Sequence, residues 1–241
     1  MIGIDRPLRP EWIYDTLRMI EVGKKPSIYN DPFEKIAEEL LGKEGKRKVR
    51  TIIFRSFIYS FQKGKTAIKR NYFIDWAEND TPDHLKPLFL MKILMDYEIA
   101  RFVVQKMMIS TDSSNRLSVS LLSKHMVKAF GDRDVVKRSL RSFLATLVHF
   151  GILRKSDQKN FILNEKQPLS HEQVKKFILL YSKAFVRSKV INLKEIETEF
   201  LYFFQPVDLI AVAVEFNGSC WEYVREIERD MLILKNDVAA G

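Results

Sequence analysis

The segment between residues 116 and 164 constrains the fold most, because helix and strand signals follow one another there in a short, fixed order. Residues 117–130 have the apolar spacing of a short helix, which Ser118 or Ser120 begins as an N-cap and Gly131 ends. A second, longer helix follows, with apolar residues three and four positions apart and a glycine behind the last of them: Val135, Val136, Leu140, Phe143, Leu144, Leu147, Val148 and Gly151.

A β-hairpin is predicted directly after the second helix. Residues 152–155 and 161–163 are short apolar runs on either side of the polar turn 156–160. Two helices followed by a hairpin are the order of a winged helix. We therefore expect residues from about Arg116 to Asn164 to form one.

The rest of the chain predicts helices with short connections, since glycine and proline are sparse, at 9 and 8 of 241 residues. Residues 66–84 are polar and aromatic and contain a clear break. Helical periodicity covers eight further stretches, at about 10–22, 31–42, 46–61, 84–109, 171–185, 193–204, 206–216 and 220–235. The predicted fold is mainly α, a compact multi-helix protein containing a winged-helix-like segment with one short β-hairpin.

This pattern divides the chain into three predicted parts. Residues 1–80 form an N-terminal helical subdomain with a basic helix, residues 81–168 a winged-helix-like domain, and residues 169–241 a C-terminal helical subdomain. The chain is 46% hydrophobic, which is enough apolar material for a substantial core.

The charge balance favours a polyanionic partner. Lys and Arg number 40 against 31 Asp and Glu, a formal net charge of +9. The single cysteine, Cys220, can form no internal disulfide and belongs to no zinc-binding cluster. The N-terminus lacks the apolar run of a secretory signal, and the longest apolar runs are far too short to span a bilayer. We therefore expect a cytoplasmic protein with no membrane partner.

Both the second helix and the hairpin of the predicted winged helix offer cations. The helical ones are three and four positions apart and share a face opposite the apolar one. The candidate nucleic-acid contacts of this segment are Lys137, Arg138, Arg141, Arg154, Lys155 and Lys159. Such side chains contact phosphates, and an arginine can fork onto a guanine edge. The alternative is a protein-docking module whose basic residues are only solvated.

A denser basic run lies between residues 43 and 70, where ten cations stand against the single acid Glu44. So one-sided a run would be repulsive without an anionic partner. Its candidate nucleic-acid contacts are Lys46, Arg47, Lys48, Arg50 and Arg55. The aromatic residues nearby fall on the apolar period, so we expect them in the core: Phe54, Tyr59, Tyr72 and Phe73.

The sequence predicts no catalytic residues. Gly64-Lys65-Thr66 is similar to the end of a P-loop, but the glycine that this motif needs five positions earlier is Tyr59. An acidic patch with a histidine is better explained by helix caps and a solvated loop than by a metal site: Asp75, Glu78, Asp80, Asp83 and His84. We expect no metal, no cofactor, no small-molecule substrate and no enzyme activity.

The layout of the whole chain resembles one known family. The features that carry the resemblance are the opening Pro10–Ile13, a basic helix ending in Arg55-Ser56-Phe57, an apolar helix through Asp96–Ile99, the segment from Leu140 to Leu153, and Trp221. These resemble the BrxA family, the small helical proteins of BREX bacteriophage-exclusion systems, over most of the chain. The resemblance implies a compact helical protein, similar to antitermination-factor-like bundles, that binds DNA within a defence system. It implies no catalytic residues.

These observations predict a non-enzymatic DNA-binding accessory protein of a phage-defence system, with duplex DNA favoured over RNA and other proteins of a defence complex as further partners. Contact is expected mainly with the phosphate backbone. Two alternatives stay open. One is a scaffold that docks protein partners through residues 209–216 or the aromatic residues of 200–204. The other is an RNA-binding antitermination-type factor.

Overall fold

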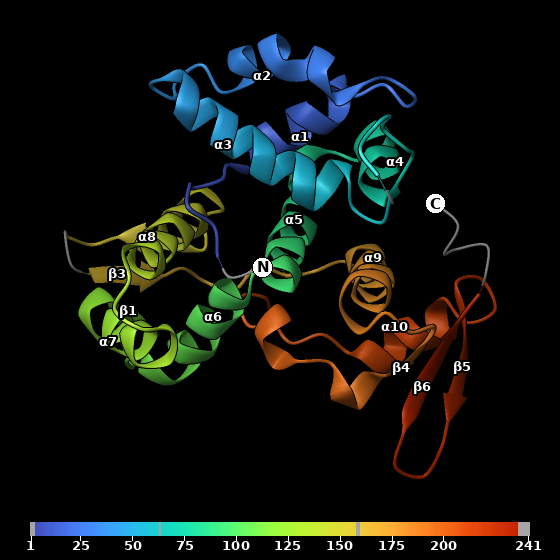
Figure 1. Ribbon diagram of the computed structural model, residues 1–241. Coiled ribbons are helices and arrows are strands. Elements are labelled where there is room, and N and C mark those ends of the chain that lie inside the picture. Colours follow the sequence, from blue (N-terminus) through green and yellow to red (C-terminus); the bar gives the residue numbers. More distant parts are fainter. Residues whose placement is uncertain (1–2, 63, 158–159, 236–241) are drawn as a thin grey trace.

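The computed structural model describes residues 3–62, 64–157 and 160–235, and the chain is mainly helical with two small antiparallel three-stranded sheets (Figure 1). The α-helices are α1 (Pro10–Met19), α2 (Asn30–Ile36), α3 (Lys43–Ile53), α4 (Tyr72–Asn79), α5 (Pro82–Asp96), α6 (Glu98–Ser110), α7 (Val119–Phe130), α8 (Asp134–His149), α9 (His171–Leu180) and α10 (Leu209–Glu215). The strands are β1 (Arg116–Ser118), β2 (Leu153–Lys155), β3 (Asn160–Leu163), β4 (Val190–Asn192), β5 (Trp221–Arg225) and β6 (Asp230–Leu234). Shorter 3-10 or π turns are η1 (Pro26–Tyr29), η2 (Phe54–Ile58), η3 (Tyr181–Val186), η4 (Leu193–Glu195) and η5 (Thr198–Phe200).

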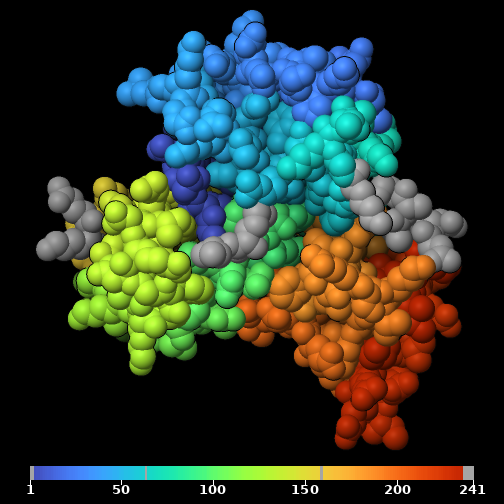
Figure 2. Space-filling model, in the orientation of Figure 1, coloured from blue at the N-terminus to red at the C-terminus, as the bar shows by residue number. Residues whose placement is uncertain are grey.

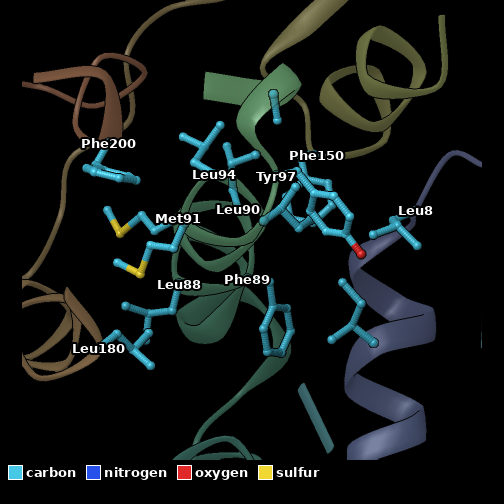
Figure 3. Close-up of a cluster of buried hydrophobic side chains, with 14 of the residues drawn as sticks. Leu8, Leu88, Phe89, Leu90, Met91, Leu94, Tyr97, Phe150, Leu180 and Phe200 are labelled. Atoms are coloured by element: carbon cyan, nitrogen blue, oxygen red, sulfur yellow. The ribbon is translucent and has the colours of Figure 1, made fainter. Parts of the chain in front are cut away.

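Helix α5 forms the centre of the core. Buried apolar residues occupy every side of it, as expected of a helix that is surrounded by other elements. Figure 3 shows Leu8, which precedes α1, on one side of this helix, and Leu180 and Phe200 from the C-terminal part of the chain on the other. The N-terminal and C-terminal parts of the sequence therefore share one hydrophobic cluster.

The predicted single helix over residues 84–109 is wrong, because the chain breaks at Tyr97. This residue has an extended backbone and a buried ring, whose hydroxyl lies 3.3 Å from Ser56 Oγ. The Arg101 guanidinium donates hydrogen bonds of 3.0 Å to the carbonyls of Leu94 and Met95. These are carbonyls that the last turn of a helix leaves unsatisfied, so α6 itself caps α5.

The polar and aromatic stretch 66–84, for which no helix was predicted, contains α4, and the predicted break at 79–83 separates α4 from α5. Asn71 begins it, since its side-chain oxygen accepts hydrogen bonds from the Phe73 and Ile74 amides at 2.9 and 3.2 Å. The same side chain donates to the carbonyls of Phe57 and Ile58, and this fixes α4 against the end of η2.

Residues 98–163 run in the order α6, β1, α7, α8, β2, β3. The three strands form an antiparallel sheet in the order β1-β3-β2, with Leu117 opposite Phe161 and Arg154 opposite Ile162. The two helices and the hairpin predicted here are present, and Ser118 caps α7 as expected. Strand β1, which completes the sheet, was not predicted.

The C-terminal part is less helical than predicted. The expected helix from Cys220 to about Lys235 is wrong: β5 and β6 form a hairpin there, joined by β4 into a second sheet in the order β4-β6-β5. Residues 193–204 also lack the predicted helix and contain only η4 and η5. The prediction of one short β-hairpin is thereby corrected to two small sheets. Trp221 anchors the second one, with a fully buried ring whose Nε1 donates to the Ala213 carbonyl at 2.9 Å.

Candidate nucleic-acid interface

Helix α8 presents one charged face to solvent. Its apolar residues, among them Leu140, Phe143 and Leu147, are buried on the opposite side, so the helical period leaves Arg138 and Arg141 exposed. Neither arginine lies within 4.0 Å of a carboxylate oxygen of a described residue. Both charges are therefore available to an anion.

Lys137 differs from its two neighbours on α8. Its ammonium group forms an ion pair with Asp132, in the turn before the helix. The hydrogen bond to this carboxylate raises the pKa of Lys137, so the lysine stays charged while its charge is already balanced. Sequence reasoning treated the three cations of α8 as equivalent, and the structure shows that they are not.

The hairpin contributes Arg154 and Lys155 from β2, both exposed and without a carboxylate partner among the described residues. Lys159 lies outside the described residues. Lys155 and Arg141 line one hollow of 380 Å³ between α8 and the sheet, whose remaining wall is mostly apolar: Val119, Leu144, Ala145, Val148, His149 and Phe161. The structure thus places one helix cation and one hairpin cation on the same hollow. Burial and the nearby Arg9 lower the pKa of His149, so at neutral pH this histidine adds no charge.

Helix α3 carries the second basic cluster, and most of its cations are already engaged. Lys46 Nζ donates to the Glu34 carbonyl at 2.9 Å. Glu44 accepts two hydrogen bonds from Arg47, at 3.0 and 2.9 Å, and its carboxylate lies 3.6 Å from Lys48 Nζ. One acid therefore pairs with two of the cations that were predicted to contact nucleic acid.

Arg50 and Arg55, the other two candidates of this cluster, line a different hollow, of 330 Å³, between η1 and α3. The Arg50 guanidinium lies 5.4 Å from the centre of the Phe54 ring. Burial lowers the pKa of Arg50, although it remains a strong base. The predicted core positions of Phe54, Tyr72 and Phe73 are confirmed, whereas Tyr59 is half-buried on the wall of this hollow.

The N-terminal segment 3–9 lies between the two basic helices. On one side, Lys48 of α3 lies 3.7 Å from Asp5. On the other, the Leu8 amide donates to Thr146 Oγ1 of α8 at 3.0 Å. Figure 2 shows this dark blue segment between the surfaces of α3 and of residues 115–150. The basic cluster of α3 and that of α8 therefore lie on two sides of the same stretch of chain.

Two arginines of this segment were missed by sequence reasoning. Arg9 forms an ion pair of 2.8 Å with Glu39, and its guanidinium lies 5.0 Å from the Trp12 ring. Arg6 is half-buried and has no carboxylate partner among the described residues. The only sequence signal was their position beside two prolines, which indicates an extended chain and no particular contact.

The acidic patch around α4 is held by cations. Arg70 binds both Asp75 and Glu78, and Lys176 Nζ lies 2.5 Å from Asp80. Over the described ranges, no three His, Cys, Asp or Glu side chains are grouped so as to hold a metal ion. The same part of the chain contains no helix with the length and apolar character needed to cross a bilayer.

The aromatic residues of 200–204, proposed above as a protein-docking surface, are mostly core. Phe200, Phe203 and Phe204 are each at most 2% exposed, so they cannot contact a partner. In the stretch 209–216, Ile210 and Val214 are exposed, and they keep that part of the docking alternative open.

Comparisons with known proteins show a likeness of fold. No protein-family model matches the chain, and no curated protein matches it. A solved structure of SspB is similar, with a TM-score of 0.59 at 10% sequence identity, over 98% of this chain and 83% of the other. The similarity covers nearly the whole chain and concerns the fold alone.

Proposed function

We propose that this chain is a non-enzymatic DNA-binding accessory protein and that residues 98–163 act as a winged helix. The observation that carries the proposal is a set of four exposed cations on α8 and β2 that have no carboxylate partner among the described residues: Arg138, Arg141, Arg154 and Lys155. Unpaired cations on a helix and on the hairpin beside it suit a helix in the major groove with the hairpin at the flanking backbone.

The order of elements supports the same proposal. A winged helix consists of a helix, a short strand, two further helices and a hairpin, to which the first strand is added. Residues 98–163 have these elements in this order, and α8 takes the place of the recognition helix. Arg141 lies at the middle of its exposed face, beside Lys155. In the proposed complex, Arg138 and Arg141 contact phosphates or guanine edges, and Arg154 and Lys155 contact the backbone of the next turn.

Salt dependence tests the proposal. Four phosphate contacts predict that the logarithm of the association constant falls with the logarithm of the salt concentration, with a slope of about −3.6. We expect the double variant R138Q/R141Q to weaken binding and to reduce the slope by about 1.8. Fluorescence anisotropy of a labelled duplex at several salt concentrations measures both quantities.

Lys137→Gln is the matched control, because it removes a cation of the same helix that Asp132 already balances. We expect this variant to leave the slope nearly unchanged. Binding that does not depend on salt, or a loss on K137Q as large as that on R138Q/R141Q, would show that the exposed face of α8 does not bind phosphate. Competition between duplex DNA and structured RNA separates this proposal from an RNA-binding antitermination-type factor.

A role in a BREX-like phage-defence system and a cytoplasmic location are part of the proposal. Their support is the resemblance in layout to the BrxA family. Genes for a methyltransferase and large ATPases beside this one would favour the defence role, and an unrelated neighbourhood would count against it.

Protein docking is the second candidate, and the hollow beside α8 favours it. Its wall is largely apolar, with Val119, Leu144 and Phe161 among its residues. A partner that co-purifies at high salt and after nuclease treatment would show docking in place of DNA binding.

A further inference from the structure

The hollow between η1 and α3 is chemically unlike the one beside α8. Three cations line it, Arg50, Arg55 and Lys65, and no Asp or Glu stands among its described lining residues. Its volume of 330 Å³ is at the lower end of the range for small-molecule sites, about 300–1,000 Å³. A polymer does not fit such a space, whereas one phosphorylated group does.

Aromatic rings hold two of these cations in place. The Arg50 guanidinium lies 5.4 Å from the centre of the Phe54 ring, and Lys65 Nζ lies 5.5 Å from the centre of the Tyr59 ring. An aromatic face attracts a cation but carries no net charge, so the charges of Arg50 and Lys65 are positioned without being cancelled. Neither Arg50 nor Lys65 forms an ion pair with a described residue, in contrast to Arg47 and Lys48.

Neutral hydrogen-bonding residues also line the hollow. They are Ser27 in η1, Asn30 at the start of α2, and Tyr59 directly after η2. The partial burial of Arg50 that lowers its pKa also removes water that would otherwise screen its charge. An anion in the hollow would thus meet a forked donor, two further cations and several neutral partners.

We propose that this hollow binds the phosphomonoester group of a nucleotide, with Arg50 and Lys65 as its principal ligands. A phosphomonoester carries more charge than a backbone phosphodiester, which suits three cations in one small space. Two sources share this chemistry, a free mononucleotide and the 5′-phosphate at the end of a DNA strand. The inference goes beyond duplex binding by α8 and does not depend on it.

Calorimetric titration of the full chain with adenosine 5′-monophosphate, and in parallel with adenosine, tests the proposal. We expect the phosphorylated compound to bind and adenosine not to bind. Arg50→Gln and Lys65→Gln should each weaken binding on the order of tenfold or more, since each removes a charge-assisted hydrogen bond. Lys65 is exposed, so its variant leaves the packing of α3 intact. Lys48→Gln, on the same helix but outside the hollow, should bind as the unmodified chain does.

A second arm compares duplexes with a 5′-phosphate and with a 5′-hydroxyl. Tighter binding of the phosphorylated duplex, lost in R50Q, identifies a strand end as the source, and binding of the mononucleotide alone identifies a free nucleotide. The proposal is overturned if neither probe discriminates for the phosphate, or if R50Q and K65Q both bind as before. If duplex DNA then still binds with a steep salt dependence, the inference fails while the proposed function stands. The reverse pattern would remove the proposed function and leave this site.

Discussion

The hydrogen bond between the N-terminal segment and α8 gives a sharp test of how the two basic helices are held. The Leu8 amide donates to Thr146 Oγ1 at 3.0 Å, and both residues are fully buried. Thr146→Val keeps the shape of the side chain and removes the hydroxyl, so the Leu8 amide is left in the core with no acceptor. Thr146 Oγ1 also donates to the Ser142 carbonyl at 2.9 Å, but this carbonyl keeps its place in the hydrogen-bond ladder of α8.

An unsatisfied buried amide costs about 1–3 kcal/mol, and this is the expected loss in the free energy of unfolding. For a chain of this length, it corresponds to a fall in Tm of about 2–12 °C. Urea unfolding followed by circular dichroism measures the loss, and amide hydrogen exchange at Leu8 shows whether it arises at the predicted place. Thr146→Ser is the matched control, because it keeps the acceptor and loses one methyl group. If T146V is as stable as the unmodified chain and the Leu8 amide keeps its protection, the segment is not held by this bond.

Two further predictions concern buried contacts. Lys92 is 3% exposed and forms an ion pair of 2.6 Å with Asp96. Asp96→Asn leaves the lysine charge buried without its partner, so it should lower the free energy of unfolding, measured in urea, by about 3–5 kcal/mol. Burial lowers the pKa of Lys92, so this group binds fewer protons in the folded chain than in the unfolded one at alkaline pH. Its contribution to stability should therefore grow as pH rises toward the ordinary lysine pKa. Because burial raises the pKa values of Tyr72 and Tyr97, which act in the opposite direction, the contribution is measured as the difference from Lys92→Met, and a difference that does not change with pH would contradict it. Gly3→Ala should lower the free energy of unfolding by about 1–3 kcal/mol in the same assay, since the new Cβ would lie 2.5 Å from Ser139 Oγ. An unchanged unfolding midpoint would mean that the N-terminal segment can shift to make room.

Local signals were sufficient for the part of the fold that positions the candidate site. A serine cap begins α7, and Gly131 and Gly151 end α7 and α8 with φ values of 81° and 73°, a conformation that favours glycine. Apolar spacing then fixed which face of α8 is buried. Each of these signals lies within a few residues of the structure it specifies, and so it can be found in one sequence.

Contacts between distant residues account for what the sequence did not predict. Strand β1 has three residues and forms only because β3, far along the chain, offers an edge. The apolar run of β6 hides its alternation: Leu232 and Leu234 point into the core, Ile233 points outward, and all three look alike in the sequence. The buried Asp230, which accepts a hydrogen bond of 2.8 Å from Tyr223, likewise looked like one charge of an exposed helix.

The same distinction holds for the charges of the candidate site. Helical spacing places Glu44 within reach of Arg47 and Lys48, so these two ion pairs could have been predicted from the sequence. The pairing of Lys137 with Asp132 depends on the turn before α8, and no spacing rule gives it.

A cation that already has a carboxylate partner contributes little to counterion release when DNA binds. The salt dependence of binding is therefore set by the number of unpaired cations at the interface, and not by the net charge of +9. On α3, in the densest basic part of the sequence, Arg47 and Lys48 are paired with Glu44 and Asp5. Four cations on α8 and β2 have no carboxylate partner among the described residues: Arg138, Arg141, Arg154 and Lys155. In the proposed complex, DNA binding therefore rests mainly on the predicted winged helix. Arg50 and Lys65, which have no carboxylate partner among the described residues, line a space that suits one phosphate group better than a duplex.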